Sequence, residues 1–280
     1  MGKRKPAVVL PLDGSKTAIS ALGAAQAVTE ILGGVLCIVH VTESQIPEDR
    51  LEKHLQISGT DLCSFLIEQV KGEPVEAILA FASKVDAKMI VMASHGFTYN
   101  DTRLVGGITM GVIQEAKSPV MVVRSDMENL PDSDWRLARL LCPLDGSPMA
   151  SAQMQQIFDL AKLLGAEVDI LNVVVQGEGS TDAGTITRSQ YEDYPQHDVP
   201  AWVDEFVRRC CEVRPPEVEL SMFQHTGEPV KTMVEFSAEH KNELIVLTWH
   251  GQLEADRARI VKGLLKQTKV PVLLTRTTPR

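Results

Sequence analysis

The sequence predicts an α/β protein built from two tandem domains, each a five-stranded parallel sheet with helices on both faces. Three observations support this prediction. Short apolar runs alternate with segments of helical period, aromatic residues make up only 5% of the chain, and three sequence segments occur twice in the same order. Strands that alternate with helices form parallel sheets through right-handed crossovers, and such sheets have aliphatic cores.

The repeated segments are long enough to indicate two copies of one fold. Pro-Leu-Asp-Gly-Ser occurs at 11–15 and again at 143–147. Residues 69–96 match residues 224–251 without a gap, sharing Gly-Glu-Pro-Val, a Phe, an Ile-Val pair and a terminal His-Gly. A third pair, Ser-Pro-Val and Val-Pro-Val followed by an apolar run and Arg, closes each copy.

The domain boundaries follow from the repeats and from one polar segment. Residues 127–135 are acidic and contain a proline, which is typical of a linker. We therefore predict one domain at 1–126 and a second at 136–280. The second domain is longer mainly through an insertion at about 176–200, rich in Gly, Ser, Thr and Asp.

Each element of the first half has a local reason. Unbroken apolar runs predict buried strands, Ser15 predicts a helix cap, Gly33-Gly34 predicts the end of that helix, and Gly-Glu-Pro predicts the start of the next. The expected strands are Ala7–Leu12, Val35–Val41, a third near Cys63–Gln69, Met89–Met92 and Val120–Val123, with a last helix ending near Ala116. In the second half we expect strands at Val168–Val174 and Val218–Gln224, a helix capped by Ser147 with Pro148 first, and an amphipathic helix at Ala201–Cys211.

Composition excludes several classes of protein. The net charge of −9 is a poor electrostatic match to nucleic acid. The longest weakly polar stretch, Ile31–Val41, falls short of the roughly 20 residues that span a bilayer. The five cysteines are odd in number and scattered, which favours buried thiols in a cytoplasmic protein over disulfides or a zinc site.

A parallel sheet of this kind binds ligands beyond the carboxyl ends of its strands. The residues at those ends are Asp13, Val41 and the loop that follows Met92. That loop reads Ala93-Ser-His-Gly96, followed by nine residues and by Gly106-Gly107 at the start of a helix. Glycines at a helix N-terminus are suited to holding a phosphate, although glycines are also common in ordinary loops of this type.

With these residues in view, each half resembles a domain of the universal stress protein family, and the whole chain resembles its tandem members. The resemblance implies the family's five-stranded parallel fold, of the adenine nucleotide alpha hydrolase-like type. It also implies a pseudo-dimer within one chain, in which the fifth strands, Val120–Val123 and Val272–Leu274, pair. The ATP-binding branch of the family carries Gly-x2-Gly-x9-Gly-Ser/Thr. Here Ala93 replaces the first glycine and Gly107 replaces the Ser/Thr, whereas Gly96 and Gly106 match.

The resemblance also implies roles for individual residues in the first half. Asp13 would meet the adenosine moiety, Val41 would offer backbone hydrogen bonds to adenine, and Pro11 and Met92 would line the base and ribose pocket. The phosphates, with any accompanying Mg²⁺, would be surrounded by His95, Gly96, Gly106, Gly107, Ile108 and Thr109. Ala93 would stand at the start of this phosphate loop, with a methyl group where the family has a glycine. The loss of a hydroxyl at Gly107 raises the question whether Thr109 substitutes for it.

The second half departs further from the family pattern. Its loop after His250-Gly251 is three residues short and contains Glu254 and Asp256, and carboxylates repel a phosphate. We therefore expect this half to be a degenerate site, although Asp145 is retained. Asp13 and Asp145 also have a simple structural role available, because an acid beside a helix N-terminus is favourable without a ligand.

The expected function is stress-associated regulation, with ATP or another adenine nucleotide as ligand of the first half and an unknown protein as partner. We do not expect the protein to be an enzyme. His95 and His250 have no nucleophile or acid partner in the sequence, and no known catalytic motif is present. Three alternatives stay open: a nucleotide-independent interaction protein, a weak ATP hydrolase, and a protein that binds another small ligand under the insertion. The sequence also leaves open whether two chains form a homodimer.

Overall fold

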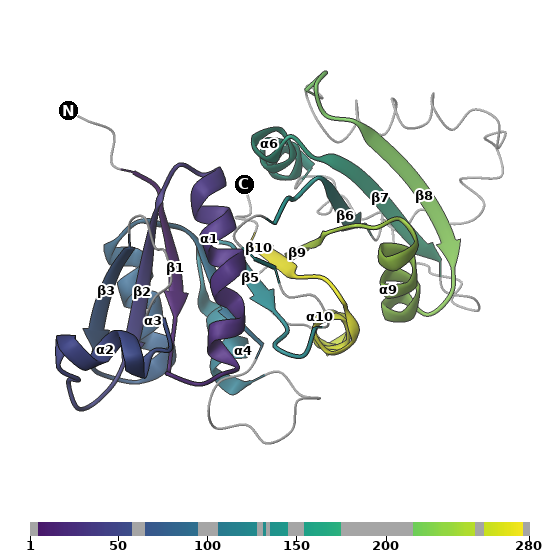
Figure 1. Ribbon diagram of the computed structural model, residues 1–280. Coiled ribbons are helices and arrows are strands. Elements are labelled where there is room, and N and C mark those ends of the chain that lie inside the picture. The colour runs from purple at the N-terminus through teal and green to yellow at the C-terminus, as the bar shows by residue number, and fades with distance from the viewer. Residues whose placement is uncertain are drawn as a thin grey trace, which may run out of the picture. The chain divides into compact units, whose positions relative to one another are not determined.

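The structure is a computed structural model that describes residues 5–57, 65–94, 106–127, 131–132, 135–144, 154–174, 215–249 and 255–276. The chain divides into two compact units. The first comprises residues 1–136 together with 249–280, and the second comprises residues 137–248. Figure 1 labels the helices and strands of both units.

The first unit is a sheet in which four neighbouring pairs of strands are parallel and one pair is antiparallel. Its strand order is β3-β2-β1-β4-β5-β10, so β1 lies between β2 and β4 in the interior. The bounds are β1 Ala7–Pro11, β2 Val35–Val41, β3 Phe65–Val70, β4 Ala87–Ala93, β5 Val120–Val123 and β10 Val272–Arg276. The side chains of Val8, Val9 and Leu10 in β1 are completely buried, as expected for a strand covered on both faces.

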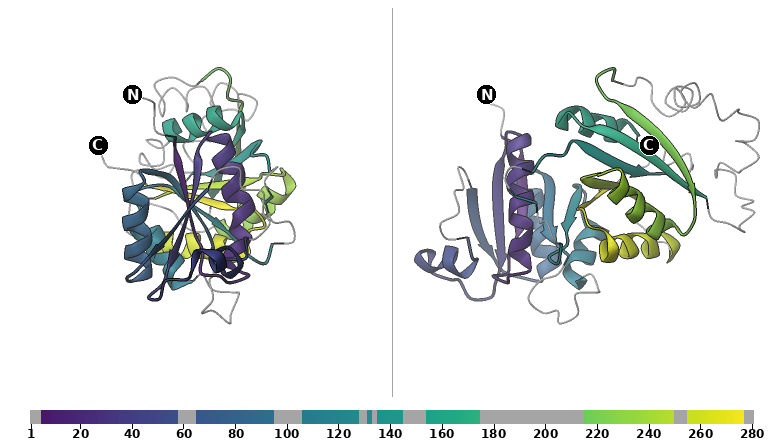
Figure 2. Two further views of the ribbon diagram at one scale, coloured as in Figure 1. Left: turned by 60° about the vertical axis from the view of Figure 1, so that its left-hand side comes forward. Right: turned by 45° about the vertical axis from the view of Figure 1, so that its right-hand side comes forward.

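Helices cover both faces of this sheet. Helix α1 (Leu22–Ile31) packs against β1, β2 and β4, and α3 (Pro74–Lys84) packs against β2, β4 and helix α4 (Gly107–Glu115). Figure 1 shows α1 in front of the strands and α3 behind them, and the left view of Figure 2 shows the twisted strands fanning out between these helices. A 3₁₀ turn, η1 (Ala18–Ala21), precedes α1, a short helix α2 (Glu48–His54) follows β2, and α10 (Ala255–Gln267) precedes β10.

The end of α1 shows how the sequence sets an element boundary. Gly33 adopts φ +57°, a left-handed conformation that side chains other than glycine rarely accept. This turn lets the N–H of Gly33 donate to the carbonyl of Glu30 and the N–H of Gly34 donate to that of Thr29, both at 2.9 Å. The two bonds form a Schellman motif, which satisfies carbonyls that the helix itself leaves unpaired.

The last strand of the chain pairs with the last strand of the first repeat. β10 is antiparallel to β5, with Leu273 opposite Met121. The Arg124 side chain, directly after β5, donates to the Thr268 carbonyl just beyond α10 at 3.0 Å. The prediction that the fifth strands of the two repeats pair is therefore confirmed.

The second unit is a parallel sheet of four strands in the order β9-β6-β7-β8. The bounds are β6 Arg139–Pro143, β7 Glu167–Val174, β8 Leu220–Thr226 and β9 Leu244–Trp249. Helices α6 (Met154–Leu164) and α9 (Pro229–Glu239) lie on opposite sides of these strands in Figures 1 and 2. The side chains of Phe158 in α6 and Phe236 in α9 are almost wholly buried.

The two-repeat α/β prediction is confirmed, and most predicted strands agree with the observed ones to within two residues. Both Gly-Glu-Pro segments begin a helix at the proline, as predicted. Helix α2 was not predicted, because its seven residues are mostly charged and have no apolar period. The boundaries 1–126 and 136–280 stay a prediction. The cap at Ser147 and Pro148, the insertion at 176–200 and the helix at 201–211 lie outside the described residues.

Gly23 is the residue of α1 that lies against the predicted linker. A Cβ atom added at Gly23 would lie 2.0 Å from the carbonyl oxygen of Pro131, a contact with backbone that cannot simply rotate away. In a helix interior, alanine is favoured over glycine by about 1 kcal/mol, so an open position would gain stability from the change. At Gly23 the clash opposes that gain.

We expect Gly23→Ala to lower the free energy of unfolding by about 1–3 kcal/mol, the usual cost of overpacking. Chemical denaturation followed by circular dichroism measures the change. Gly107→Ala is the matched control, because a Cβ atom there meets nothing within 4 Å. A Gly23→Ala variant as stable as the Gly107→Ala variant would show that the linker does not lie tightly against α1.

Candidate functional site

The carboxyl ends of β1, β2 and β4 lie at one edge of the first sheet. β1 pairs in parallel with β2 on one side and with β4 on the other. The chain therefore leaves β1 toward β2, and later returns through β4 and β5 on the opposite side. This reversal of direction is the switch point at which open α/β sheets bind ligands.

The Asp13-Gly14-Ser15 turn connects β1 to the first helical segment. One carboxylate oxygen of Asp13, Oδ1, accepts hydrogen bonds from the backbone N–H of Ser15 at 2.9 Å and from its hydroxyl at 2.6 Å. The Ser15 hydroxyl oxygen in turn accepts from the N–H of Ala18, the first residue of η1, at 3.0 Å, although the N-cap residue of η1 is Thr17 and that of α1 is Ala21. Gly14 has φ +83°, so the turn needs a glycine there. Asp13 therefore has a structural function, and its side chain is exposed at the sheet edge.

The backbone of Val41 faces the position just beyond the end of β1. In a parallel ladder, successive residues direct their N–H and C=O groups to alternate sides of the strand. The N–H of Thr42 donates to Val70 in β3, whereas the carbonyl of Val39 accepts from Leu12, next to β1. The N–H and C=O groups of Val41, two residues further along, point to the same side of β2 as those of Val39. They therefore point toward the space where β1 has already ended.

Helix α4 is fixed to the end of β4 by two hydrogen bonds. The N–H of Gly106 donates to the carbonyl of Ser94 at 2.8 Å, and the Thr109 hydroxyl donates to the carbonyl of Ala93 at 3.1 Å. The first bond of the helix itself runs from Met110 to Gly106. The N–H groups of Gly107 to Thr109 are thus outside the helical ladder, at the positive end of the helix dipole.

The predicted residues differ in exposure. Gly107 and Ile108 are exposed, Pro11 and Val41 are half-buried, and Met92, Ala93, Gly106 and Thr109 are buried. Because the Thr109 hydroxyl hydrogen is directed at Ala93, it holds the helix in place in this structure. His95 and Gly96 lie outside the described residues, as do Asp145, His250 and Glu254. Asp256 belongs to α10, not to a loop. In the described part of the chain no group of three or more His, Cys, Asp or Glu residues could hold a metal ion.

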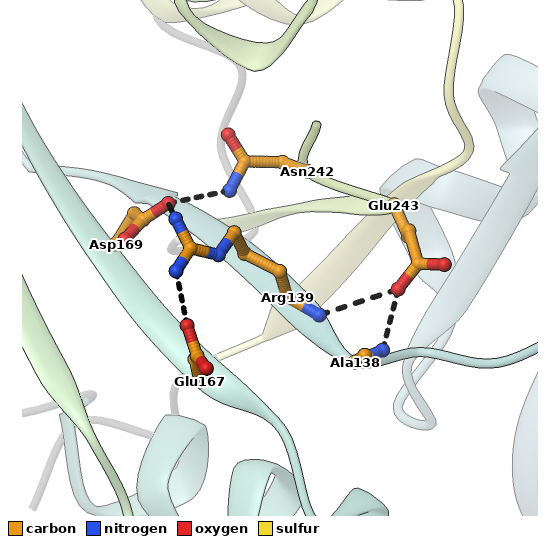
Figure 3. A network of polar contacts seen from close by, with 6 residues as sticks. All are labelled: Ala138, Arg139, Glu167, Asp169, Asn242 and Glu243. Carbon is orange, nitrogen blue, oxygen red and sulfur yellow. Dashed lines mark hydrogen bonds and ion pairs between the residues drawn. The ribbon is translucent and has the colours of Figure 1, made fainter. Parts of the chain in front are cut away.

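The second unit contains a polar network that the sequence reading missed. It lies at the opposite, amino-terminal edge of the sheet, where Arg139 and Glu167 begin β6 and β7 (Figure 3). The Arg139 guanidinium forms ion pairs with Glu167 and, at 3.5 Å, with Asp169. Asp169 also accepts from the Asn242 amide at 2.8 Å. The Glu243 carboxylate accepts from the N–H groups of Ala138 and Arg139, at 2.5 and 3.3 Å.

The buried member of this network is the Asp169 carboxylate, whose side chain is 1% exposed. Within the described ranges, Asp169 Oδ1 and Asn242 Oδ1 are buried without a hydrogen-bond partner. The hydrogen bond to Glu167, aided by the negative charges of Asp169, Glu167 and Glu219, raises the pKa of Arg139, although partial burial opposes this shift. Burial, with the Asp169 charge second, also raises the pKa of the Cys142 thiol well above its ordinary value, so this thiol stays protonated and unreactive.

At the corresponding positions the first repeat has apolar residues, except that Lys88 stands where the second repeat has Glu243. Sheet register and the gapless alignment make Arg139, Glu167, Asp169 and Asn242 equivalent to Ala7, Val35, Cys37 and Ala87. Aligning the two repeats would have revealed the network, because charged and polar residues of the second repeat stand opposite apolar residues of the first. The network therefore distinguishes the two units.

Removing one partner of a buried ion pair leaves the other charge uncompensated. We expect Arg139→Met to lower the free energy of unfolding by about 1–2 kcal/mol, because the buried Asp169 carboxylate loses its guanidinium partner, while the 35% exposure of Arg139 screens part of that interaction. The double variant Arg139→Met with Asp169→Asn should be more stable than the single variant, since the amide is neutral and still accepts from Asn242. Denaturant titration of the three proteins measures this, and a double variant weaker than the single one would contradict it.

The Thr109 bond offers a second stability test. Thr109 is 3% exposed, so Thr109→Val preserves shape but leaves the Ala93 carbonyl without its hydroxyl partner. We expect a loss of about 1–3 kcal/mol in the free energy of unfolding, the cost of an unsatisfied buried polar group. Thr109→Ser keeps the hydroxyl and should recover most of it. Equal stability of the Val and Ser variants would show that the bond does not hold α4.

Known proteins match this chain in sequence and in fold. The model of the "Universal stress protein family" matches residues 63–124 and 137–276. Universal stress proteins of Mycobacterium tuberculosis and Mycobacterium bovis are 23% identical over 212 residues, which cover 75% of this chain and 68% of theirs. No helix in the described residues is long and apolar enough to cross a membrane.

Solved structures agree with this assignment at the level of the fold. A universal stress protein from Archaeoglobus fulgidus has a TM-score of 0.64 at 16% identity, with 98% of this chain and 97% of that chain covered. A putative universal stress protein from Pseudomonas aeruginosa also has a TM-score of 0.64, at 11% identity, with 97% and 93% covered. The family model spans more than half of the chain and includes parts of both repeats, so this chain belongs to the universal stress protein family.

Proposed function

We propose that the first repeat binds ATP or another adenine nucleotide, and that the protein uses this ligand in its stress-response role as a regulator rather than as an enzyme. The observation that carries the proposal is the meeting of two complementary features at one sheet edge. The peptide groups of Val41 face the space beyond β1, and the N-terminus of α4 lies at the end of neighbouring β4.

The base would bind at the Val41 side. A peptide N–H and C=O that point in one direction match the acceptor and donor at the edge of adenine. The half-buried Pro11 and the buried Met92, at the ends of β1 and β4, would supply apolar walls for the base and ribose. Asp13, whose Oδ1 accepts from Ser15 at the end of β1, would meet the adenosine moiety at the same edge of the sheet.

The phosphates would bind at the N-terminus of α4. Helix N-termini attract anions through unpaired N–H groups and through the dipole. Gly107 and Ile108 are exposed there, while Gly106 and Thr109 are committed to Ser94 and Ala93. Ala93, His95 and Gly96 would complete the phosphate loop, and Mg²⁺ would accompany the nucleotide as its counterion.

The second repeat, within a domain at 136–280, would contain a degenerate site. Glu254 directly precedes α10 and Asp256 is its second residue, where the family pattern has a glycine loop. The protein would act in the cytoplasm through an unknown protein partner. A nucleotide-independent interaction protein is the second candidate, favoured by the engagement of the Thr109 hydroxyl in the fold.

Isothermal titration calorimetry with ATP and with adenosine tests the proposal, and Gly107 supplies matched variants. A side chain at Gly107 has open space, and an acid in the first turn favours the helix itself. We expect Gly107→Asp to weaken ATP binding by about tenfold through charge repulsion, and to leave adenosine binding unchanged. Gly107→Ser, which adds a neutral donor, should bind ATP at least as tightly as the natural protein.

Two outcomes would reject the proposal. One is the absence of bound nucleotide in gently purified protein, with no heat at high micromolar ATP. The other is an equal effect of Gly107→Asp on ATP and on adenosine, because the phosphates would then not lie at α4. ATP turnover that is lost in a His95→Ala variant would instead favour the hydrolase alternative.

A further inference from the structure

The carbonyl group of Leu12 has an unusual partner for its place in the sheet. Leu12 directly follows β1, and its N–H still bonds in the ladder, to the Val39 carbonyl at 3.0 Å. In a parallel ladder the next bond would run from the N–H of Val41 to the carbonyl of Leu12. Across the described ranges no backbone donor reaches that carbonyl. Instead it bonds to Nδ1 of His40 at 2.8 Å.

His40 therefore substitutes for the backbone of its own neighbour. Its side chain is 4% exposed, so a hydrogen bond is required at this position rather than optional. Because the carbonyl of Leu12 accepts a hydrogen, Nδ1 is the protonated nitrogen of the ring. The ladder ends one step early as a result, and the N–H of Val41 keeps its direction toward β1 without being bonded to Leu12.

The second repeat builds the same bond with a different side chain. Asn172 holds the position equivalent to His40, and its amide donates to the carbonyl of Leu144 at 3.0 Å. Leu144 matches Leu12, because its N–H donates to the Leu171 carbonyl just as Leu12 donates to Val39. Two different side chains that make one bond in two copies of a fold indicate that the bond itself is what the fold requires.

The surroundings of His40 hold its ring in place. The ring contacts that of His54 at the end of α2, with centroids 5.2 Å apart in an edge-to-face arrangement. His54 also lies against Gly14, where an added Cβ atom would come within 3.0 Å of its Nε2 atom. The side chain of Gln56 donates to the Gly14 carbonyl at 2.5 Å. Helix α2 and the residues directly after it thus support both His40 and the turn that follows β1.

We propose that His40 is a positioning residue, which caps the Leu12 carbonyl so that the peptide N–H of Val41 remains available to a ligand. The ligand part of this inference rests on the proposed adenine site, whereas the cap concerns the ligand-free protein alone. Without the imidazole, the ladder would extend by one bond, and the Val41 N–H would be consumed by Leu12. The base would then lose a hydrogen bond although every residue that contacts it is unchanged.

Residue-resolved amide hydrogen exchange of the ligand-free chain tests the cap. In the natural protein the Val41 amide should exchange much faster than that of Val39. In His40→Ala it should become at least tenfold slower, because Val41 now bonds to Leu12. In His40→Asn it should stay fast, since Asn172 shows that an amide can span the same gap. A Val41 amide as protected as Val39 in the natural protein would overturn the proposal and requires no variant to fold.

Adenosine titration supplies the second readout. His40→Ala should weaken adenosine binding by about five- to tenfold, and His40→Asn should restore it. Equal adenosine affinity of the natural protein and a folded His40→Ala variant would overturn the positioning role. If the natural protein binds no adenosine, the proposed function fails, while the exchange of Val41 still decides whether His40 is the cap.

Discussion

The parallel pairing of β1 with both of its neighbours is the constraint on which the first unit depends. Because β1 lies between β2 and β4, three strand ends meet at one edge of the sheet, and the helices on both faces bury the residues of β1. Every candidate feature of the site follows from that meeting. The Asp13 turn begins where β1 ends, Val41 extends past it on one side, and α4 begins beside it on the other.

The two repeats share one fold but differ in the side chains at the amino-terminal edge of their strands, whereas a hydrogen bond at the carboxyl edge is common to both. At the amino-terminal edge, one copy has small apolar residues and the other has an arginine–carboxylate network. At the carboxyl edge, both copies retain the capped carbonyl, through His40 in one and Asn172 in the other. The buried Asp169 carboxylate is supported by Arg139 and Asn242. This network makes the second unit sensitive to changes that the first would tolerate.

Regular patterns in the sequence were sufficient for the fold, whereas the site residues that they suggested stay a prediction. Strands such as Val35–Val41 and Val120–Val123 are unbroken apolar runs, and Gly-Glu-Pro marks two helix starts, so these elements follow from local signals. Helix α2 has no such signal, because it is held by Leu51 and by loop contacts rather than by an apolar stripe. The role of His40 depends on where β1 diverges from β2, which is a tertiary property. Its only trace in the sequence is a histidine and an asparagine at equivalent positions of the repeats.

The strand that completes the first sheet comes from the far end of the chain. Arg124 and Thr268, which are bonded beside the β5–β10 pair, are separated by 144 residues. Such a contact can form only after a long loop has closed, and long-range pairing slows folding. During synthesis β5 (Val120–Val123) is made well before its antiparallel neighbour β10 (Val272–Arg276). The edge of β5 that β10 covers therefore lacks this partner throughout that interval, and an unpaired strand edge is a place where other chains can add.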